Sequence, residues 1–102
     1  MELKNGARLR SQVDATEVIV VRGRDGDVEL ACGGHPMLDL SATPAEGLSA
    51  KDGLDGGTQL GKRYIDAAAA IELLVTKPGT GSLTLDGEAL ELKSAKPLPA
   101  SD

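Results

Sequence analysis

The chain of 102 residues carries a formal net charge of −5, with 11 Lys and Arg against 16 Asp and Glu. This acidic balance, with its basic residues scattered along the chain, excludes the basic surface that binding to phosphate backbones requires, so we expect no nucleic-acid partner. The core must be built from aliphatic residues, because Tyr64 is the only aromatic side chain in the sequence.

The first half of the chain predicts a β-hairpin. Residues 17–21 (EVIVV) form a β-branched run, and a turn signal at residues 23–26 (GRDG) separates them from residues 27–31 (DVELA). Apolar and acidic residues alternate in the second run, which is typical of a strand with one buried face. We interpret its acidic positions as a solvated strand face, and they are Asp25, Asp27 and Glu29.

The middle of the chain predicts a flexible linker over residues 41–58, since this stretch is rich in Ser, Ala, Pro, Asp and Gly. The alanine run at residues 67–70 is too short for an independent helix, so we expect a tight loop or one helical turn there. The polar, Pro-rich tail at residues 94–102 is expected to be disordered or to dock on a partner.

The second half predicts the same arrangement as the first. Residues 71–76 (IELLVT) and 82–85 (SLTL) are strand-like runs on either side of a turn at residues 77–81 (KPGTG). A further turn at residues 86–87 (DG) leads into residues 89–92 (ALEL), where apolar residues again alternate. We therefore divide the chain into a first half at residues 1–40 and a second half at residues 59–93.

An internal repeat relates the two halves. When the chain is shifted by 55 positions, residues 6–26 align with residues 61–81 without a gap. The aligned pairs are Gly6 and Gly61, Arg8 and Arg63, Ala15 and Ala70, Glu17 and Glu72, Ile19 and Leu74, Val20 and Val75, and Gly26 and Gly81. After the turn the register shifts by two, so that Leu30 aligns with Leu83 and Met37 with Leu90. We predict an all-β fold in which two similar units cover each other's apolar faces about a pseudo-twofold axis.

The segment at residues 30–37 (LACGGHPM) resembles the closing motif Leu-x-Cys-Cys-Gly-x-Pro-Met of desulforedoxin and of the N-terminal domain of desulfoferrodoxin. Residues 17–21 resemble the apolar strand of that family, and residues 61–64 (GKRY) resemble the entry to its Cys-x-x-Cys segment. The resemblance covers roughly residues 6–38 and 61–92. It implies a desulforedoxin-like dimer fused into one chain, a family in which each unit holds iron or zinc between four thiolates.

Most of the ligand positions implied by the resemblance are not cysteine in this chain. The first site would consist of Ser11, Asp14, Cys32 and Gly33, and the second of Asp66, Ala69, Leu85 and Asp86. Only Cys32 retains a thiol, and one sulfur with carboxylates does not reproduce a thiolate-rich centre. The resemblance therefore implies a degenerate metal site in the first half and no site in the second.

Several interpretations of the region around Cys32 remain open. Asp14, Cys32 and His35 would form a residual iron or zinc site with an open position if Asp14 and Cys32 approach each other, as the resemblance implies. Cys32, His35 and Met37 are also the donors of a copper site, although such sites need a second histidine. In the alternative interpretation Cys32 is a small buried apolar residue and Met37 fills the core. A nucleophile and base at Cys32 and His35 would lack a third orienting group.

The function we expect is a non-catalytic accessory or protein-interaction module derived from a rubredoxin-like metal domain, with no catalytic residue and no cofactor. The alternative is an iron or zinc protein with an electron-transfer or structural site near Cys32, and a small-molecule-binding barrel is a third class. A protein partner or self-association through a strand edge or through residues 94–102 is expected.

The same residues indicate a cytoplasmic protein that does not contact a membrane. Residues 1–10 (MELKNGARLR) lack the apolar segment of a secretory signal, and no apolar run approaches the ~20 residues that span a bilayer. The single cysteine, Cys32, cannot form an internal disulfide, which is typical of proteins in a reducing compartment.

Overall fold

The computed structural model describes residues 1–24, 26–66 and 70–93. Within these ranges the chain is all-β and contains no helix, in agreement with the predicted fold class. The strands are β1 (Arg8–Arg10), β2 (Glu17–Arg22), β3 (Leu30–Cys32), β4 (His35–Pro36), β5 (Leu38–Asp39), β6 (Arg63–Ile65), β7 (Glu72–Lys77), β8 (Leu83–Leu85), β9 (Glu88–Ala89) and β10 (Glu91–Leu92).

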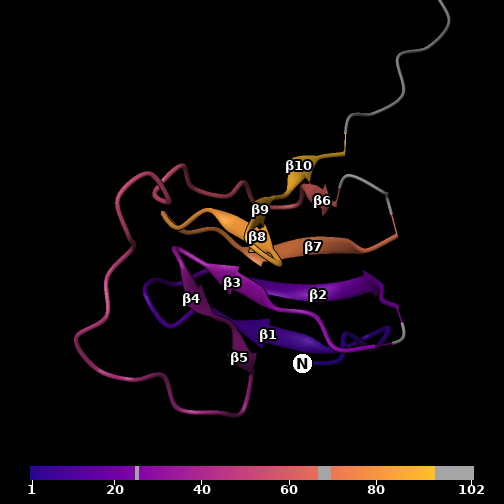
Figure 1. The fold of residues 1–102 in the computed structure, drawn as a ribbon, viewed down its shortest axis with the longest axis horizontal. Helices are drawn as coiled ribbons and strands as arrows, with labels where there is room; N and C mark the ends of the chain where they lie inside the picture. Colours follow the sequence, from indigo (N-terminus) through magenta and orange to yellow (C-terminus); the bar gives the residue numbers. More distant parts are fainter. Residues whose placement is uncertain (25, 67–69, 94–102) are drawn as a thin grey trace, which may run out of the picture.

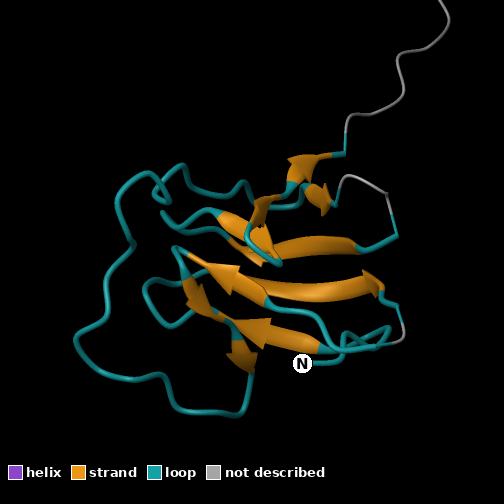
Figure 2. Cartoon of the chain, in the orientation of Figure 1, coloured by secondary structure: helices purple, strands orange, loops and turns teal. Residues whose placement is uncertain are grey.

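The described strands form two antiparallel sheets, and each sheet contains strands from both halves of the chain (Figure 1, Figure 2). The six-stranded sheet has the order β10-β6-β7-β2-β1-β5, and the four-stranded sheet has the order β4-β3-β8-β9. Both strand orders are symmetric about a central pair. Each strand of the first half lies as many strands from that pair as the strand of the second half that the sequence alignment matches to it. The central pairs are β2 with β7 and β3 with β8.

Residues that the sequence repeat aligns with each other are direct partners at the centre of both sheets. Ile19 lies opposite Leu74 in the β2–β7 pair, and Ala31 lies opposite Thr84 in the β3–β8 pair. Equivalent backbone hydrogen bonds also form within each half. The Gly6 N–H donates to the Val20 carbonyl at 2.7 Å and the Gly61 N–H to the Val75 carbonyl at 2.9 Å. The Met37 N–H donates to Leu30 and the Leu90 N–H to Leu83, at 2.9 and 3.0 Å.

The predicted positions of the main strands are close to those observed, but the predicted hairpin pairings are wrong. β2 pairs with β1 and β7, whereas β3 lies in the other sheet and pairs with β4 and β8. β7 and β8 are separated in the same way. The segment between β2 and β3 crosses from one sheet to the other because Val28, which is only 3% exposed, packs into the shared core. A hairpin would leave the apolar faces of both strands on a single sheet with nothing to cover them.

The turn at Asp86-Gly87 is confirmed, since it joins β8 to β9 with Leu85 opposite Glu88. Asp86 has a φ of 51°, in the left-handed region that Asp tolerates better than most residues. The strand predicted over residues 89–92 is divided between β9 and β10, which lie in different sheets. The division arises because Leu90 turns into the core between them.

The connection between the halves, residues 41–58, contains neither strand nor helix and runs as a wide loop on the left of Figure 1. It is attached to both halves. The Lys51 N–H donates to the Gly33 carbonyl at 2.9 Å, and the Leu54 carbonyl accepts from the Ser82 N–H at 2.9 Å. Asp25, most of the alanine run (residues 67–69) and the tail (residues 94–102) lie outside the described residues.

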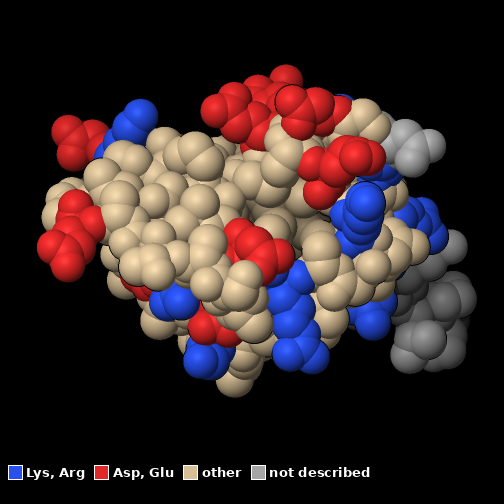
Figure 3. Space-filling view, turned by 90° about the horizontal axis from the view of Figure 1, so that it is seen from below, with Lys and Arg blue, Asp and Glu red and all other residues tan. Residues whose placement is uncertain are grey.

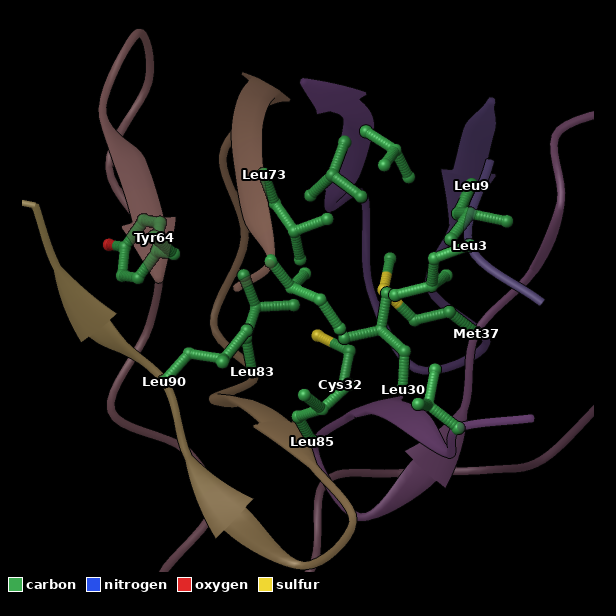
Figure 4. Close-up of a cluster of buried hydrophobic side chains, with 14 of the residues drawn as sticks. Leu3, Leu9, Leu30, Cys32, Met37, Tyr64, Leu73, Leu83, Leu85 and Leu90 are labelled. Carbon is green, nitrogen blue, oxygen red and sulfur yellow. The ribbon is translucent and has the colours of Figure 1, made fainter. Parts of the chain in front are cut away.

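The core lies between the two sheets, and Tyr64 is the one aromatic side chain among its described residues. Figure 4 shows Cys32 among leucines, with Leu30 on one side and Leu83 and Leu85 on the other. Cys32 is fully buried and Met37 is 1% exposed, so both side chains lie where the core-filling interpretation places them. Each half supplies a face that the other half covers, and no separate core exists for either half among the described residues.

Candidate functional site

The loop between β1 and β2 directs Asp14 toward the interior. The Ser11 N–H donates to the Thr16 carbonyl at 2.9 Å, which closes the loop at its base. The Ser11 hydroxyl then accepts from the Val13 N–H at 3.1 Å, and Asp14 Oδ1 accepts from the Thr16 N–H at 3.0 Å. These short side chain–backbone bonds favour a tight turn over an extended strand, so they hold the Asp14 carboxylate in one position.

The Asp14 carboxylate contacts Cys32 and the turn between β7 and β8. Cys32 Sγ lies 3.9 Å from Oδ1, within the range of a weak S–H···O bond. The Gly81 N–H donates to Oδ2 at 2.5 Å, and the Thr80 hydroxyl lies 3.5 Å from the same oxygen. Asp14 and Cys32 thus approach each other, as the resemblance implies, and the same carboxylate links the two halves.

Gly79 and Gly81 close the site from the second half. A Cβ atom at Gly81 would lie 2.7 Å from Cys32 Sγ, and one at Gly79 would overlap the Thr16 hydroxyl. Neither residue has a positive φ, so close approach and not backbone conformation is the reason for glycine here. The turn at residues 77–81 can therefore lie directly against Asp14, Thr16 and Cys32.

The site contains a carboxylate and a protonated thiol at neutral pH. Burial raises the pKa of Asp14, but hydrogen bonds, the strongest of them from the N–H groups of Gly81 and Thr16, outweigh it and hold that pKa below its ordinary value. Burial raises the pKa of the Cys32 thiol, and the negative charge of Asp14 raises it further. The thiol is therefore a hydrogen-bond donor to Asp14.

His35 does not join this cluster. It follows the Gly33-Gly34 turn and pairs with Cys32 through the backbone of β3 and β4, but its Nε2 lies 3.0 Å from the Ser49 carbonyl in the connecting loop. Across the described ranges, no group of three or more His, Cys, Asp or Glu side chains is placed so that it could hold a metal ion.

The donor set around Cys32 does not fit the iron or zinc centre that the resemblance implies. It offers one neutral thiol and one carboxylate, whose oxygens already face four hydrogen-bond donors from Thr16, Cys32, Thr80 and Gly81. Four thiolates in a tetrahedral arrangement are what such a centre requires.

The corresponding place in the second half is less polar. Ile71, fully buried, aligns with Thr16, and Leu85 aligns with Cys32. Asp66 Oδ1 accepts from the Ile71 N–H at 3.0 Å, as Asp14 does from the Thr16 N–H. Asp66, Leu85 and Asp86, three of the four ligand positions assigned to this half, line one pocket of about 260 Å³ with Arg24 at its side. The fourth position, Ala69, lies outside the described residues.

No family model, curated protein or solved structure matches this chain. The resemblance to desulforedoxin therefore rests on the residues quoted from the sequence. In the described part of the chain, no helix has the length and apolar character needed to cross a membrane.

Sequence reasoning missed several residues of the site. No sequence pattern marks Thr16, whose side chain is fully buried and whose Oγ1 has no hydrogen-bond partner within the described structure. The contacts of Thr80 and Gly81 with Asp14 were also missed, because they depend on how the second half packs against the first. The available signal is the pair of glycines in the KPGTG turn, Gly79 and Gly81, because glycine allows another segment to approach closely.

Proposed function

We propose that this chain is a non-catalytic protein-interaction module, built from two desulforedoxin-like units, in which packing and hydrogen bonds replace the metal. The observation that carries the proposal is the position of Asp14. Its carboxylate lies beside Cys32, at an implied ligand position, and accepts hydrogen bonds from the backbone of both halves. A negatively charged group that is satisfied by N–H donors needs no metal to compensate it.

Two features support duplication about a pseudo-twofold axis. The strand order of each sheet is symmetric about its central pair, and Ile19–Leu74 and Ala31–Thr84, which the repeat aligns, are those central partners. Reciprocal hydrogen bonds support the same arrangement. The Gly33 N–H donates to Ser82 in the second half, and the Asp86 N–H donates to Glu29 in the first, at 2.9 and 2.8 Å. Such reciprocity is characteristic of an isologous contact between two copies.

Fusion of the two units offsets part of the stability that a structural metal supplies. Metal binding in small domains contributes folding free energy directly, so its loss has to be compensated elsewhere. When both units belong to one chain, their association no longer depends on concentration. The Asp14 contacts add a polar link between the same two units.

The state of Cys32 supports a non-catalytic role. Nucleophilic and redox cysteines are exposed thiolates with a lowered pKa, whereas Cys32 is fully buried and its pKa is raised. His35, the one histidine in the sequence, bonds to Ser49 and does not act as a base toward this thiol. The role we assign to Cys32 is that of a core residue with a weak hydrogen bond to Asp14.

A partner protein or a further copy of the chain would bind at the exposed surface of this fold, either at a strand edge or through residues 94–102. We place this interaction in the cytoplasm, and it involves neither nucleic acid nor a membrane. The outer strands β4, β5, β9 and β10 each span two residues, and β4 contains Pro36. Short edges of this kind present few free backbone groups to an added strand. Side chains on a sheet face are therefore an additional surface for recognition.

Elemental analysis of protein purified without added metal, together with a pull-down from the native host, tests this function. We expect no stoichiometric iron or zinc, an unchanged metal content in the Cys32→Ser variant, and capture of a defined partner. Stoichiometric metal that disappears in Cys32→Ser would replace the proposal with the metal-protein alternative. Light scattering on the same sample separates self-association from binding to another protein.

A further inference from the structure

A groove opens on the outer face of the six-stranded sheet, where β1, β2 and the end of β7 meet the residue that follows β5. It has a volume of about 310 Å³, and its lining residues include Arg8, Glu17, Ile19, Leu40, Thr76 and Lys77. Ile19 and Leu40 are apolar, and Arg8 and Lys77 are cationic. Arg8 and Ile19 are cross-strand partners, so both side chains project from the same face of the sheet.

The equivalent place in the second half is closed by a cation. There, Glu72 aligns with Glu17 and receives two charged donors, Arg63 Nη1 and Lys93 Nζ, each at 2.9 Å. The Glu72 side chain is only 9% exposed as a result. Glu17 has a single ion pair, to Lys77 Nζ at 3.2 Å, and its side chain is 21% exposed.

One substitution between the repeats accounts for this difference. Leu40 and Lys93 occupy the same backbone position, because the Leu40 N–H donates to the Arg8 carbonyl at 3.1 Å and the Lys93 N–H to the Arg63 carbonyl at 2.8 Å. The leucine cannot reach over the sheet to a glutamate as the lysine does. Leu40 therefore contributes an apolar surface next to Ile19, and a groove lies where the second half has the Lys93–Glu72 ion pair.

The charge balance of the groove favours an anionic occupant. Lys77 and Glu17 neutralise each other, whereas Arg8 has no carboxylate within 4.0 Å among the described residues. Arg63, which aligns with Arg8, forms an ion pair with Glu72 at 2.9 Å. Acidic side chains dominate the chain as a whole, and Figure 3 shows many of them along its upper edge, while most visible Lys and Arg lie below and to the right.

We propose that this groove binds an acidic–aliphatic segment of a partner protein, with an aliphatic side chain against Ile19 and Leu40 and a carboxylate on the Arg8 guanidinium. The groove pairs an apolar surface with one unneutralised cation, and such a segment satisfies both. The inference rests on the proposed interaction function and assigns that function a surface and a partner chemistry. The second half, with Glu72 fully paired, is the closed counterpart of the same site.

The test is an NMR titration of the full ¹⁵N-labelled chain with a short capped peptide that alternates leucine and aspartate. We expect saturable shifts centred on the amides of Arg8, Ile19, Leu40 and Lys77, with half-saturation below about 1 mM, and no such shifts with a leucine–lysine peptide. Arg8→Glu should weaken binding by about tenfold or more. The matched control, Lys51→Glu, makes a cation-to-carboxylate change at an exposed residue of the connecting loop, which bonds to Gly33 beside the other sheet and does not line the groove, and it should bind as the wild type does.

Leu40→Lys provides the sharper variant, because it supplies the cation that closes the equivalent place in the second half. It should abolish peptide binding while leaving the denaturation midpoint unchanged or raised. Equal binding by Leu40→Lys and wild type, or shifts that fall elsewhere, would overturn the groove assignment. Concentration-dependent shifts at the groove without peptide would instead identify a second copy as its occupant. If a partner is captured in the pull-down but the groove does not respond, this inference fails and the interaction function stands.

Discussion

The Asp14 carboxylate accepts a hydrogen bond of 2.5 Å from the N–H of Gly81, a residue 67 positions later in the chain. The bond joins the loop between β1 and β2 to the turn between β7 and β8, so it links the first half to the second. It also lies beside Cys32, the single cysteine of the sequence. A local Asx turn in one half therefore serves as a contact between halves, and its removal has consequences that can be measured.

Replacement of Asp14 by asparagine should destabilise the fold. The amide lacks the negative charge that strengthens the bonds from Gly81 and Thr16, and one of its two termini is a donor that faces other donors. We expect a loss of about 1–3 kcal/mol in the free energy of unfolding, measured by urea denaturation. Asp52→Asn, at an exposed position of the connecting loop, is the control and should unfold as the wild type does. An Asp14→Asn protein of wild-type stability would show that the carboxylate does not link the halves.

The same carboxylate should make stability depend on acid pH. Since hydrogen bonds lower the folded-state pKa of Asp14 below the ordinary value of 3.8, the folded state binds this proton less readily than the unfolded state. The contribution is therefore present above about pH 4 and is lost as the pH falls below 3.8 toward the folded-state pKa. Denaturation curves between neutral pH and pH 3 should show a difference between wild type and Asp14→Asn that narrows with acid. A constant difference would assign the effect of the variant to packing.

The strands and the site differ in how much of them the sequence reveals. The sequence identifies β2, β7 and β8 as strands, because β-branched residues and alternation of apolar with polar residues favour extended backbone locally. The runs alone do not predict how those strands pair. β2 and β3 lie in different sheets, and the segment between them packs Val28 into the core that the two sheets share, which is a contact between distant parts of the chain. The approach of Asp14 to Cys32 followed from the family resemblance, whereas the contacts of Asp14 with Gly81 and Thr80 depend on packing between distant segments.

Gly81→Ala should destabilise the protein through contact with Cys32. The added methyl group would lie 2.7 Å from Cys32 Sγ and 3.0 Å from the Gly33 nitrogen, so the turn must move away from the site. Overpacking of this kind costs about 1–3 kcal/mol. A double-mutant cycle with Cys32→Ala measures the coupling, and the double variant should be more stable than the sum of the two single effects predicts. Simple additivity would show that the Gly33 backbone, and not the thiol, is the obstacle.

Thr16→Val should be tolerated or stabilising, in contrast to Asp14→Asn. The Thr16 side chain is fully buried and its Oγ1 atom has no partner within the described structure, so a methyl group of the same size removes an uncompensated polar atom. Valine also approaches the apolar character of Ile71, the aligned residue of the second half. The free energy of unfolding from urea denaturation should fall by no more than about 0.5 kcal/mol. A loss as large as that of Asp14→Asn would reveal that the hydroxyl bonds to the Asp14 carboxylate.

Glu72→Gln should destabilise the fold more than Glu17→Gln, although the repeat aligns the two glutamates. The bond from Lys93 holds the pKa of Glu72 below its ordinary value against the opposing effect of burial, and Arg63 adds a second favourable contact. Gln at residue 72 would leave both cations without their counter-charge, whereas Gln at residue 17 affects only a single and more exposed pair, with Lys77. Thermal denaturation of the two variants at low and high salt makes the comparison, and the gap in midpoint should shrink as salt screens the Glu72 pairs. Equal midpoints at low salt would indicate that Arg63 and Lys93 contribute no net stability, and that the closed site of the second half is closed by geometry alone.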